Sequence, residues 1–404
     1  MPGPLVGFRV LDLSRILAGP WASQMLADLG AEVIKIERPQ TGDDTRSWGP
    51  PYMPDEAGQA TAEAAYFHAA NRGKYSVCID ISSRQGQELI VNFVARCDVL
   101  IENFKVGGLK RYGLDYASLK RINPKLVYCS ITGFGQTGPY AERAGYDFMI
   151  QAMGGLMSVT GEPGGPPMKV GVALADVMTG LYAANAIQAA LIHQLRSGEG
   201  QYIDLALLDV QVATLANQAM NYLASGNNPQ RLGNAHPNIV PYQAFQTRDG
   251  YLILAVGNDA QFKRFCDLAG RPDLASDERY AKNSERVKNR EKLVPQLIDI
   301  MHSKPTEDWL DQLNAQGIPC GPINNIDAVF ANPQVRHRGI QFELEHASAG
   351  KVASVANPIR FSKTPVTYEK APPTLGQHTE QVLSELLELD SMQIYQLRAE
   401  SIID

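Results

Sequence analysis

The stretch FRVLDLSRILAGPWASQMLADLGAEVIKIE, residues 8–37, decides the fold. Residues 8–13 have the apolar pattern of a strand, and 21–29 carry apolar residues at helical spacing. Gly30 ends this helix, and a second strand pattern fills 32–37. A strand, a helix and a strand joined by short connections predict two parallel strands linked by a right-handed crossover.

The same alternation continues along the chain. Strand patterns recur over 75–81, 99–102, 126–131 and 202–206, and helical patterns recur over 84–97, 176–196 and 209–223. Repeated units of this kind predict an α/β fold, with a parallel sheet whose two faces are both covered by helices.

Two polar segments interrupt this pattern. Residues 42–58 are expected to form a loop, and 227–241 a second loop that marks a domain boundary. Beyond it, 242–325 has the pattern of a smaller α/β unit that begins with a hairpin. We expect strand and loop over 333–373 and a helical tail over 375–403.

The composition excludes several classes of protein. The 404 residues are 44% hydrophobic and 20% charged, which excludes a wholly disordered chain. The formal net charge of −6 argues against a nucleic-acid binder, which is normally basic. Five cysteines without a CxxC pair argue against a disulfide framework or a structural zinc site and favour a reducing compartment.

The most membrane-like stretch is 170–192, which carries Asp176, Asn185 and Gln188. These polar residues predict a buried core helix rather than a membrane span. No basic region followed by a long apolar core is found near residue 1, so no secretory signal is expected. We expect a cytoplasmic protein, with an organelle matrix as the alternative, and no membrane partner.

The turn after the first strand lacks a dinucleotide fingerprint. It reads LAGPWAS over 17–23 rather than GxGxxG, and Pro20 removes a backbone N–H donor. NAD binding is therefore not expected, although Glu37 ends the second strand where a ribose-binding acid would lie. The sequence also lacks the GxSxG, HExxH and Walker A motifs, and its seven histidines form no metal-ligand spacing. We predict no metal site.

The segment GGPPMKVGVALADVMTG, residues 164–180, places Asp176 at the start of a long apolar helix. Asp176 is a candidate N-cap, a role that aspartate favours. It is also a candidate reactive carboxylate, because a helix N-terminus stabilises an anion while apolar neighbours exclude water. Such a carboxylate can attack an activated acyl group as a covalent nucleophile. The residues alone leave both interpretations open.

Basic residues gather near the expected carboxyl ends of the strands, where ligands of open parallel sheets bind. A polyanionic ligand would meet several of them, namely Arg15, Arg38, Arg46, Arg72, Lys74, Lys105, Arg111 and Lys169. His236 lies in the loop GNAHPNIVP, 233–241, among turn formers. Loops on a rigid scaffold often carry function, so His236 is a further candidate.

Several spaced motifs, in the right order, resemble the class III CoA-transferases, the group of formyl-CoA transferase and carnitine CoA-transferase. The resemblance covers essentially the whole chain. Its most specific pieces are VLDLSRILAGPWASQMLADLGAEVIKIERP (10–39), DDTRSW (43–48), IENFKVGGLKRYGL (101–114), SITGFGQTGPY (130–140), VGVALADVMTG (170–180), SGEGQYIDLALLD (197–209) and GIPCGPI (317–323).

The resemblance implies a Rossmann-like large domain built from residues 1–225 and 331–404, with a smaller α/β domain over 226–330 inserted between them. Two such chains would interlock as a homodimer. The implied reaction moves CoA from an acyl-CoA to a free carboxylate, and Asp176, at the ALAD position, would be the nucleophile. Coenzyme A is then substrate and product, and no permanently bound cofactor is implied.

The family's CoA-binding motifs match Arg38, Asn103, Gly108, Arg111 and Tyr146. The two arginines would pair with phosphates, and the glycine would allow close backbone approach. The related α-methylacyl-CoA racemases carry a histidine base in a GHD motif, where this chain has tyrosine. Tyrosine, with an ordinary pKa of about 10, is a poor base at neutral pH. Transfer is therefore favoured over a racemase-like isomerase, and a non-catalytic acyl-CoA-binding protein is a third alternative.

The pattern is most similar to the succinyl-CoA:glutarate branch, which implies short dicarboxylates as substrates. Arg15 occupies the place of a histidine in formyl-CoA transferase, and its guanidinium would bind the second carboxylate through two hydrogen bonds. Arg46, Lys169 and His236 are the other candidates for this role. Formyl-CoA transferase covers its site with a run of glycines, which this chain lacks, and 233–241 is the nearest candidate lid.

Overall fold

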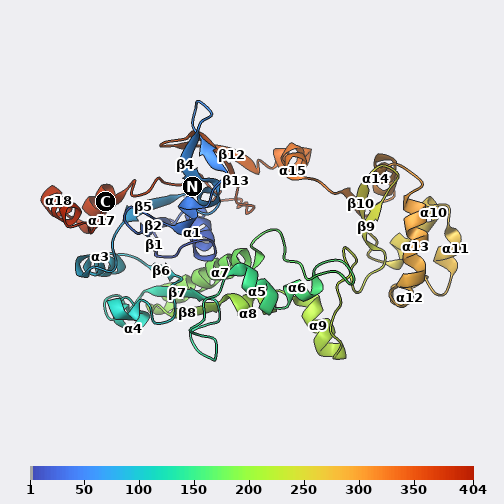
Figure 1. The fold of residues 1–404 in the computed structure, drawn as a ribbon, viewed down its shortest axis with the longest axis horizontal. Coiled ribbons are helices and arrows are strands. Elements are labelled where there is room, and N and C mark those ends of the chain that lie inside the picture. The colour runs from blue at the N-terminus through green and yellow to red at the C-terminus, as the bar shows by residue number, and fades with distance from the viewer. Residues whose placement is uncertain (1–2) are drawn as a thin grey trace. The chain divides into compact units, whose positions relative to one another are not determined.

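The computed structural model describes residues 3–404, which divide into two compact units (Figure 1). The larger unit contains 3–156, Val170–Ala219 and Gln334–Asp404, and the smaller one contains Met157–Lys169 and Met220–Pro333. The sequence placed the inserted domain at 226–330, and it gave no sign of the outlying segment Met157–Lys169. Each unit has a core of its own.

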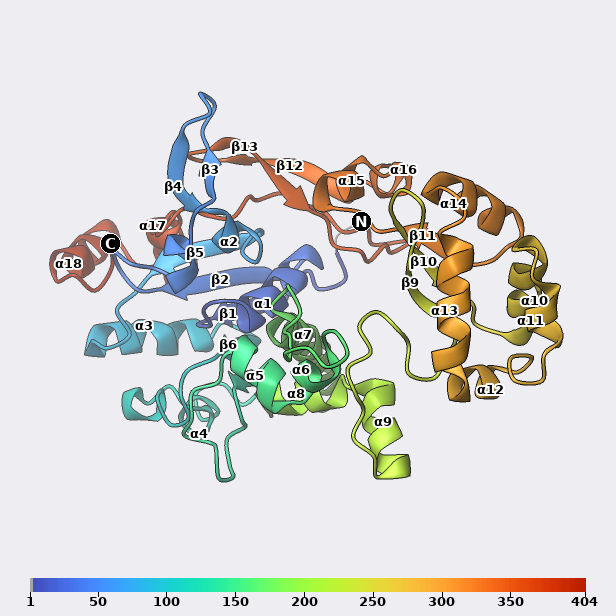
Figure 2. The same ribbon diagram turned by 45° about the vertical axis from the view of Figure 1, so that its right-hand side comes forward.

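The larger unit is built on a six-stranded sheet in which all pairings are parallel. Its strands, in spatial order, are β5 (Lys74–Cys78), β2 (Glu32–Glu37), β1 (Arg9–Asp12), β6 (Val99–Glu102), β7 (Val127–Thr132) and β8 (Tyr202–Ala206). Figure 2 shows β5, β2, β1 and β6 side by side. Numbered along the chain, this order is 3-2-1-4-5-6, the Rossmann order, which reverses between β1 and β6. The predicted α/β, Rossmann-like fold is confirmed.

Helices cover both faces of this sheet. On one face α1 (Ala18–Asp28) and α7 (Leu174–Ser197) pack on Val10 and its neighbours. On the other face α3 (Arg84–Val94), α17 (Thr379–Leu387) and α18 (Ser391–Ala399) pack around Leu11 and its neighbours. Consecutive strand residues such as Val10 and Leu11 thus enter opposite cores, as the two-residue period of a strand requires. Each fully buried aliphatic side chain contributes about 1.5–3 kcal/mol.

The end of the chain completes the free edge of this sheet beside β5. The backbone N–H of Cys78 donates to Thr379 Oγ1 at 3.0 Å, and the N–H of Ser76 donates to His378 Nδ1 at 3.1 Å. The N–H of Asp80 donates to the carbonyl of Ile402 at 2.8 Å. In Figure 1 the red helix α17 accordingly lies beside blue β5, and α18 packs against α17.

The remaining elements of the larger unit are short and lie between the main strands and helices. They are the 3₁₀ turns η1 (Asp44–Ser47) and η2 (Lys110–Tyr112), the antiparallel pairs β3 (Tyr52–Pro54) with β4 (Ala60–Ala64) and β12 (Gln341–His346) with β13 (Gly350–Val355), and the helices α2 (Ala65–His68), α4 (Tyr116–Leu119), α5 (Asp147–Met153) and α8 (Leu207–Ala213). Three helices, α6 (Leu156–Val159), α9 (Ala216–Ser225) and α16 (Pro333–His337), span the unit boundaries.

The smaller unit has a three-stranded antiparallel sheet in the order β11 (Cys320–Pro322), β10 (Tyr251–Ala255), β9 (Tyr242–Gln246). Its helices are α10 (Asp259–Leu268), α11 (Pro272–Ser276), α12 (Asn283–Lys288), α13 (Arg290–Met301), α14 (Thr306–Ala315) and α15 (Ile326–Ala331). Buried Phe262, Phe265 and Trp309 anchor the core, and the Trp309 indole N–H donates to the Met301 carbonyl at 2.8 Å.

Several boundaries differ from those predicted. Helix α1 begins at Ala18, because Pro20 lies in its first turn, where no intrahelical N–H is required. The helix predicted over 209–223 is two helices, α8 and α9, separated where Ala216 adopts a left-handed φ of 48°. The tail likewise divides at Glu388, which has a φ of 59°. Within residues 3–404, no helix combines the length and the apolar composition needed to cross a membrane.

Candidate active site

A cavity of about 430 Å3 opens where the strand order of the large sheet reverses. It is lined by the loops after β1, β6 and β7 and by Asp176 at the start of α7, and we name it the Asp176 cavity. Ligands of open α/β sheets bind in the crevice beyond the carboxyl ends of the strands at such a reversal. The fold thus brings Asp176 to the expected position of a binding site.

A second cavity of about 310 Å3, the Arg38 cavity, is lined by the loops after β1, β2 and β5. Arg15, Phe104 and Arg111 line both cavities, which therefore adjoin. Arginine side chains line both cavities, Arg38 lies in the second, and the Asp176 carboxylate lies in the first. This arrangement fits an elongated ligand with an anionic end and a reactive end.

The loop after β1 is held by side chains from two other loops. The backbone N–H of Arg15 donates to Asn103 Oδ1 at 3.0 Å, and Asn103 Nδ2 donates to the Arg15 carbonyl at 2.8 Å. Ile16 adopts a left-handed φ of 72°, a costly conformation for a β-branched residue. Its N–H donates to both carboxylate oxygens of Asp43 at 3.2 Å. Asn103, a predicted CoA ligand, therefore also fixes the backbone of the site.

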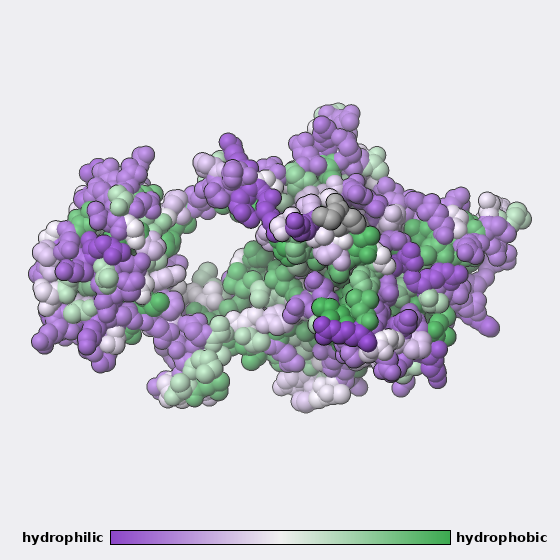
Figure 3. All heavy atoms as spheres, turned by 180° about the vertical axis from the view of Figure 1, so that it is seen from behind, coloured by the Kyte–Doolittle hydropathy of each residue, from purple (hydrophilic) through white to green (hydrophobic). Residues whose placement is uncertain are grey.

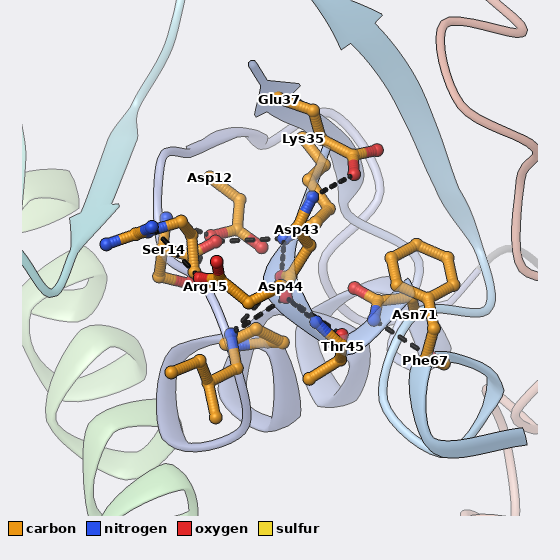
Figure 4. Close-up of polar contacts among 12 residues, drawn as sticks. Asp12, Ser14, Arg15, Lys35, Glu37, Asp43, Asp44, Thr45, Phe67 and Asn71 are labelled. Atoms are coloured by element: carbon orange, nitrogen blue, oxygen red, sulfur yellow. Dashed lines mark hydrogen bonds and ion pairs between the residues drawn. The ribbon is translucent and has the colours of Figure 1, made fainter. Parts of the chain in front are cut away.

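Behind this loop lies a buried network of charges (Figure 4). Lys35 Nζ donates to Asp43 Oδ2 at 2.9 Å and to the Ser14 carbonyl at 2.8 Å. Burial by itself raises the pKa of Asp43, but Lys35 and hydrogen bonds from Thr45 lower it to about 2. Burial lowers the pKa of the neighbouring Lys74 to about 7, against the attraction of Asp12. The network ties the first two strand ends to the site loop.

Asp176 is the third residue of α7 and does not cap it. The N-cap position is Ala173, which offers no side-chain hydrogen bond. Asp147 of α5 supplies the cap instead, because its Oδ1 accepts from the N–H of Ala175 at 2.8 Å and of Asp176 at 3.3 Å. The interpretation of Asp176 as an N-cap is therefore wrong: a carboxylate remote in sequence occupies the N–H groups.

The Asp176 carboxylate itself is half-buried and faces the cavity. In the described part of the chain, no hydrogen bond or ion pair to this carboxylate is found. Burial, followed by the negative charge of Asp147, raises the pKa of Asp176 to about 7. A carboxylate that is poorly solvated and unpaired is a reactive base and nucleophile.

The structure brings the predicted CoA-binding residues to these two cavities. Asn103, Gly108, Arg111 and Tyr146 line the Asp176 cavity, and Arg38 lines the adjoining one. A Cβ on Gly108 would lie 2.8 Å from a backbone carbonyl oxygen, so the turn requires glycine there. Tyr146 is 63% exposed, and Arg111 lies over the Tyr112 ring, with 4.5 Å to its centroid.

The four residues predicted to bind a substrate carboxylate are divided between the two units. Arg15 lines both cavities, where its Nη1 pairs with Asp44 at 2.9 Å. Arg46 lines neither, because Glu37 accepts two of its hydrogen bonds at 2.8 Å and Phe67 stacks beneath it at 3.7 Å. The guanidinium N–H groups of Arg46 thus donate to Glu37 and to the Pro373 carbonyl inside the protein.

Lys169 and His236 belong to the smaller unit and line neither cavity. Lys169 is exposed at the end of its segment. His236 Nδ1 accepts from the backbone N–H of Asn238 at 3.0 Å, and its ring packs on Tyr242. Burial and Arg290 lower the pKa of His236.

The sequence analysis missed two residues of the site, Arg143 and Asp147. Arg143 lines the Asp176 cavity and lies over Tyr140, with 4.5 Å to the ring centroid. The available signal was the pair of glycines at 133 and 145: a Cβ on Gly133 would lie 2.5 Å from Gly145 Cα. This backbone crossing pins the segment 143–147 against the end of β7.

Among the described residues, Glu63, His68 and His346 form a group whose donor atoms lie within 4.8 Å of one another. Nδ1 of His346 accepts the N–H of Ser348 at 3.2 Å and of Ala349 at 3.1 Å. Nδ1 of His346 is thus engaged by two backbone N–H groups, which leaves Nε2 as its other ring nitrogen.

Comparison with known proteins agrees with this geometry. The model of CoA-transferase family III matches residues 5–379. The chain belongs to CoA-transferase family III. It is therefore an enzyme, a class III CoA-transferase, for which coenzyme A is a substrate. The resemblance predicted from the motifs is confirmed.

Individual relatives cover nearly the whole chain. Succinate–glutarate CoA-transferase of Agrobacterium fabrum is 56% identical over 95% of this chain and 96% of its own length. Human succinyl-CoA:glutarate CoA-transferase is 44% identical over 99% of this chain and 90% of its own. The crystal structure of a CAIB/BAIF family protein from Brucella suis is 53% identical, with a TM-score of 0.83 over 96% of this chain and 100% of that one.

Proposed function

We propose that the enzyme transfers CoA from succinyl-CoA to glutarate or a similar short dicarboxylate, with Asp176 as the covalent nucleophile. The observation that carries the proposal is the unpaired, half-buried Asp176 carboxylate, with its raised pKa, in a cavity at the reversal of the sheet order. The substrate pair follows from the names of the relatives that are 56% and 44% identical.

The reaction proceeds by four acyl exchanges. An Asp176 oxygen attacks the thioester carbon of succinyl-CoA, and the carbon–sulfur bond breaks to give a mixed anhydride and CoA thiolate. The thiolate attacks the Asp176 acyl carbon, which releases succinate and leaves an aspartyl-CoA thioester. Glutarate then displaces the thiolate to form a second anhydride. The thiolate attacks its glutaryl carbon, which yields glutaryl-CoA and restores the Asp176 carboxylate.

Two adjoining cavities suit the two ends of CoA. Arg38 and Arg111 bind the phosphates, since charge-assisted hydrogen bonds from guanidinium to phosphate are strong. The pantetheine chain passes along Phe104, which lines both cavities, and brings the thioester to Asp176. Each step exchanges groups of similar reactivity, so the protein contributes positioning, oxyanion stabilisation and exclusion of water.

The second carboxylate of the acceptor is bound by Arg15. A buried charge without a partner is costly, so a site that accepts diacids needs a cation within reach of the reacting end. Arg15 lines the Asp176 cavity, and its pairing with Asp44 leaves further guanidinium N–H groups for a ligand. Arg143 lines the same cavity, so an Arg143 variant is the matched control for an Arg15 variant.

We infer a homodimer, as the family resemblance implies. Large apolar side chains are exposed on α7, among them Leu181, Tyr182, Ile192 and Leu195. Figure 3 shows hydrophobic residues gathered on one face of the larger unit. Several large apolar side chains exposed on one helix are typical of a protein interface. A location in the cytoplasm, or in an organelle matrix, stays a prediction from the cysteine content.

The test is a transfer assay with succinyl-CoA as donor and a panel of free acids, on wild type, Asp176→Ala and the matched control Asp327→Asn, whose side chain is exposed on α15. We expect efficient glutaryl-CoA formation in wild type and in the control, and none in Asp176→Ala. Turnover retained by folded Asp176→Ala would refute the covalent mechanism. Exchange of α-deuterium without transfer would indicate the racemase-like isomerase instead.

A further inference from the structure

The first turn of α7 would stabilise the charge of a carboxylate placed in it, and this would weaken the carboxylate as a nucleophile. The first N–H groups of a helix have no intrahelical partner, and with the helix dipole they stabilise a nearby anion. Asp176 is the third residue of α7, within reach of this stabilisation. An anion held by such donors is a weaker nucleophile, because part of its charge is already neutralised by hydrogen bonds.

Asp147 occupies those donors instead. Its Oδ1 accepts from the N–H of Ala175 at 2.8 Å and from the N–H of Asp176 at 3.3 Å. The donors that a carboxylate at the third helical position would use are therefore engaged by another acid. The Asp176 side chain is left without a hydrogen bond in the described residues.

Asp147 is in turn firmly held. The buried Gln151 donates from Nε2 to Asp147 Oδ2 at 2.8 Å, and its Oε1 accepts the N–H of Val170 at 2.9 Å. Two residues before Asp147, Gly145 packs so closely on Gly133 that a Cβ would lie 2.3 Å from its Cα. Asp147 thus has a fixed position relative to both β7 and α7.

We propose that Asp147 is a positioning residue that takes up the N–H groups of the first turn of α7, so that the Asp176 carboxylate stays unstabilised and free to attack the thioester. This inference rests on the proposed role of Asp176 as nucleophile. Asp147 touches the backbone of the reacting residue and not the substrate. Its negative charge, next to burial, also raises the pKa of Asp176.

Other charged and titratable groups face Asp176 from the neighbouring elements. Tyr66 of α2 is close enough for Asp176 and Asp147 to raise its pKa, after burial. The remaining groups line the same cavity: Arg15, Lys105, Arg111, Arg143 and Tyr146. These groups are unchanged by substitution at 147, so a shift in the pH profile of such a variant reports the charge of Asp147 itself.

The test compares Asp147→Asn, which keeps the Oδ1 acceptor but removes the charge and the Oδ2 acceptor of Gln151, with Asp147→Ala, which removes all three. The readout is kcat/KM for succinyl-CoA between pH 5 and pH 9. The wild-type acidic limb is expected near the Asp176 pKa of about 7. A loss of about one pKa unit in Asp147→Asn would raise the ratio of the rate at pH 6 to the rate at pH 8.5 about fivefold.

Asp147→Ala is expected to lose turnover at every pH, and Asp147→Asn to restore much of it. The matched control is Asp390→Asn, an acid that caps α18 and should leave the profile unchanged. An acidic limb of Asp147→Asn at the wild-type pH, or full turnover in Asp147→Ala, would overturn the inference. If Asp147→Asn does not fold, Gln151→Met is measured instead. We expect its kcat to fall at constant KM, and an unchanged kcat would contradict the role of Asp147.

Asp176→Ala is measured in parallel to separate this inference from the proposed function. Loss of turnover in Asp176→Ala together with a wild-type limb in Asp147→Asn refutes only the role of Asp147. Turnover retained in Asp176→Ala refutes the nucleophile, and the role of Asp147 with it.

Discussion

Replacing Lys35 by Met should destabilise the larger unit much more than loss of a surface ion pair does. Lys35 and Asp43 are both 0% exposed, and their charged atoms lie 2.9 Å apart. Met has a similar length but no charge, so the Asp43 carboxylate would stay buried without its strongest partner. Breaking a buried pair in this way costs about 3–5 kcal/mol.

The matched control is Arg9→Met. Arg9 pairs with Glu32 at 3.1 Å, with exposed fractions of 28% and 41%, and such solvent-exposed pairs contribute about 0–1 kcal/mol. The assay is urea unfolding of both variants at pH 7.5, with hydrogen exchange to locate the loss. We expect the extra exchange of Lys35→Met to concentrate in 9–47. Equal shifts of the two variants would refute the argument from burial.

The pH dependence gives a second check. The pKa of Asp43 is about 2 in the folded chain and 3.8 in the reference state, so its ion pair stabilises the fold above pH of about 4. This stabilisation is lost as pH falls from about 4 to about 2. The stability gap between wild type and Lys35→Met should therefore be widest near neutral pH and narrow on acidification. A gap that widens at low pH would contradict this assignment.

Three further predictions concern ligands and assembly. Arg15→Ala should lower the preference for glutarate over butyrate as acceptor at least tenfold, measured as the ratio of kcat/KM for the two acids, whereas Arg143→Ala should leave this ratio nearly unchanged. A ratio that falls in Arg143→Ala and not in Arg15→Ala would assign the carboxylate-binding role to Arg143. Gly108→Ala should raise KM for succinyl-CoA about tenfold or more, because its Cβ would meet a carbonyl oxygen at 2.8 Å, while Gly321→Ala, with open space at its Cβ, should not. Light scattering of the dilute enzyme should show a homodimer, and a stable, active monomer would exclude the interlocked assembly.

The sequence predicted the sheet because its information is local. The apolar runs at 8–13, 32–37, 99–102 and 126–131 are buried on both sides, and each run is bounded by turn formers. Their parallel pairing follows from the short helical connections. The ends of helices were predicted less accurately where one residue type fits two positions. Pro20 is typical of a break before a helix, yet it lies in the first turn of α1.

The site was harder to predict, because its decisive contacts join residues far apart in the chain. The N-cap interpretation of Asp176 failed since Asp147, 29 residues away, reaches the same N–H groups. Arg46 looked available for a ligand, but Glu37 and Phe67 enclose its guanidinium. No local pattern distinguishes a free arginine from one that an acid on a neighbouring strand already binds.

Mass spectrometry of the enzyme during turnover tests the central claim most directly. Wild-type enzyme is incubated with succinyl-CoA and hydroxylamine, then digested, and the peptide that contains residue 176 is sequenced. Since both the anhydride and the aspartyl-CoA thioester react with hydroxylamine, we predict a hydroxamate on Asp176 that appears only when succinyl-CoA is present. An unmodified Asp176 in enzyme that is turning over, or a hydroxamate on a different carboxylate, would contradict the covalent mechanism.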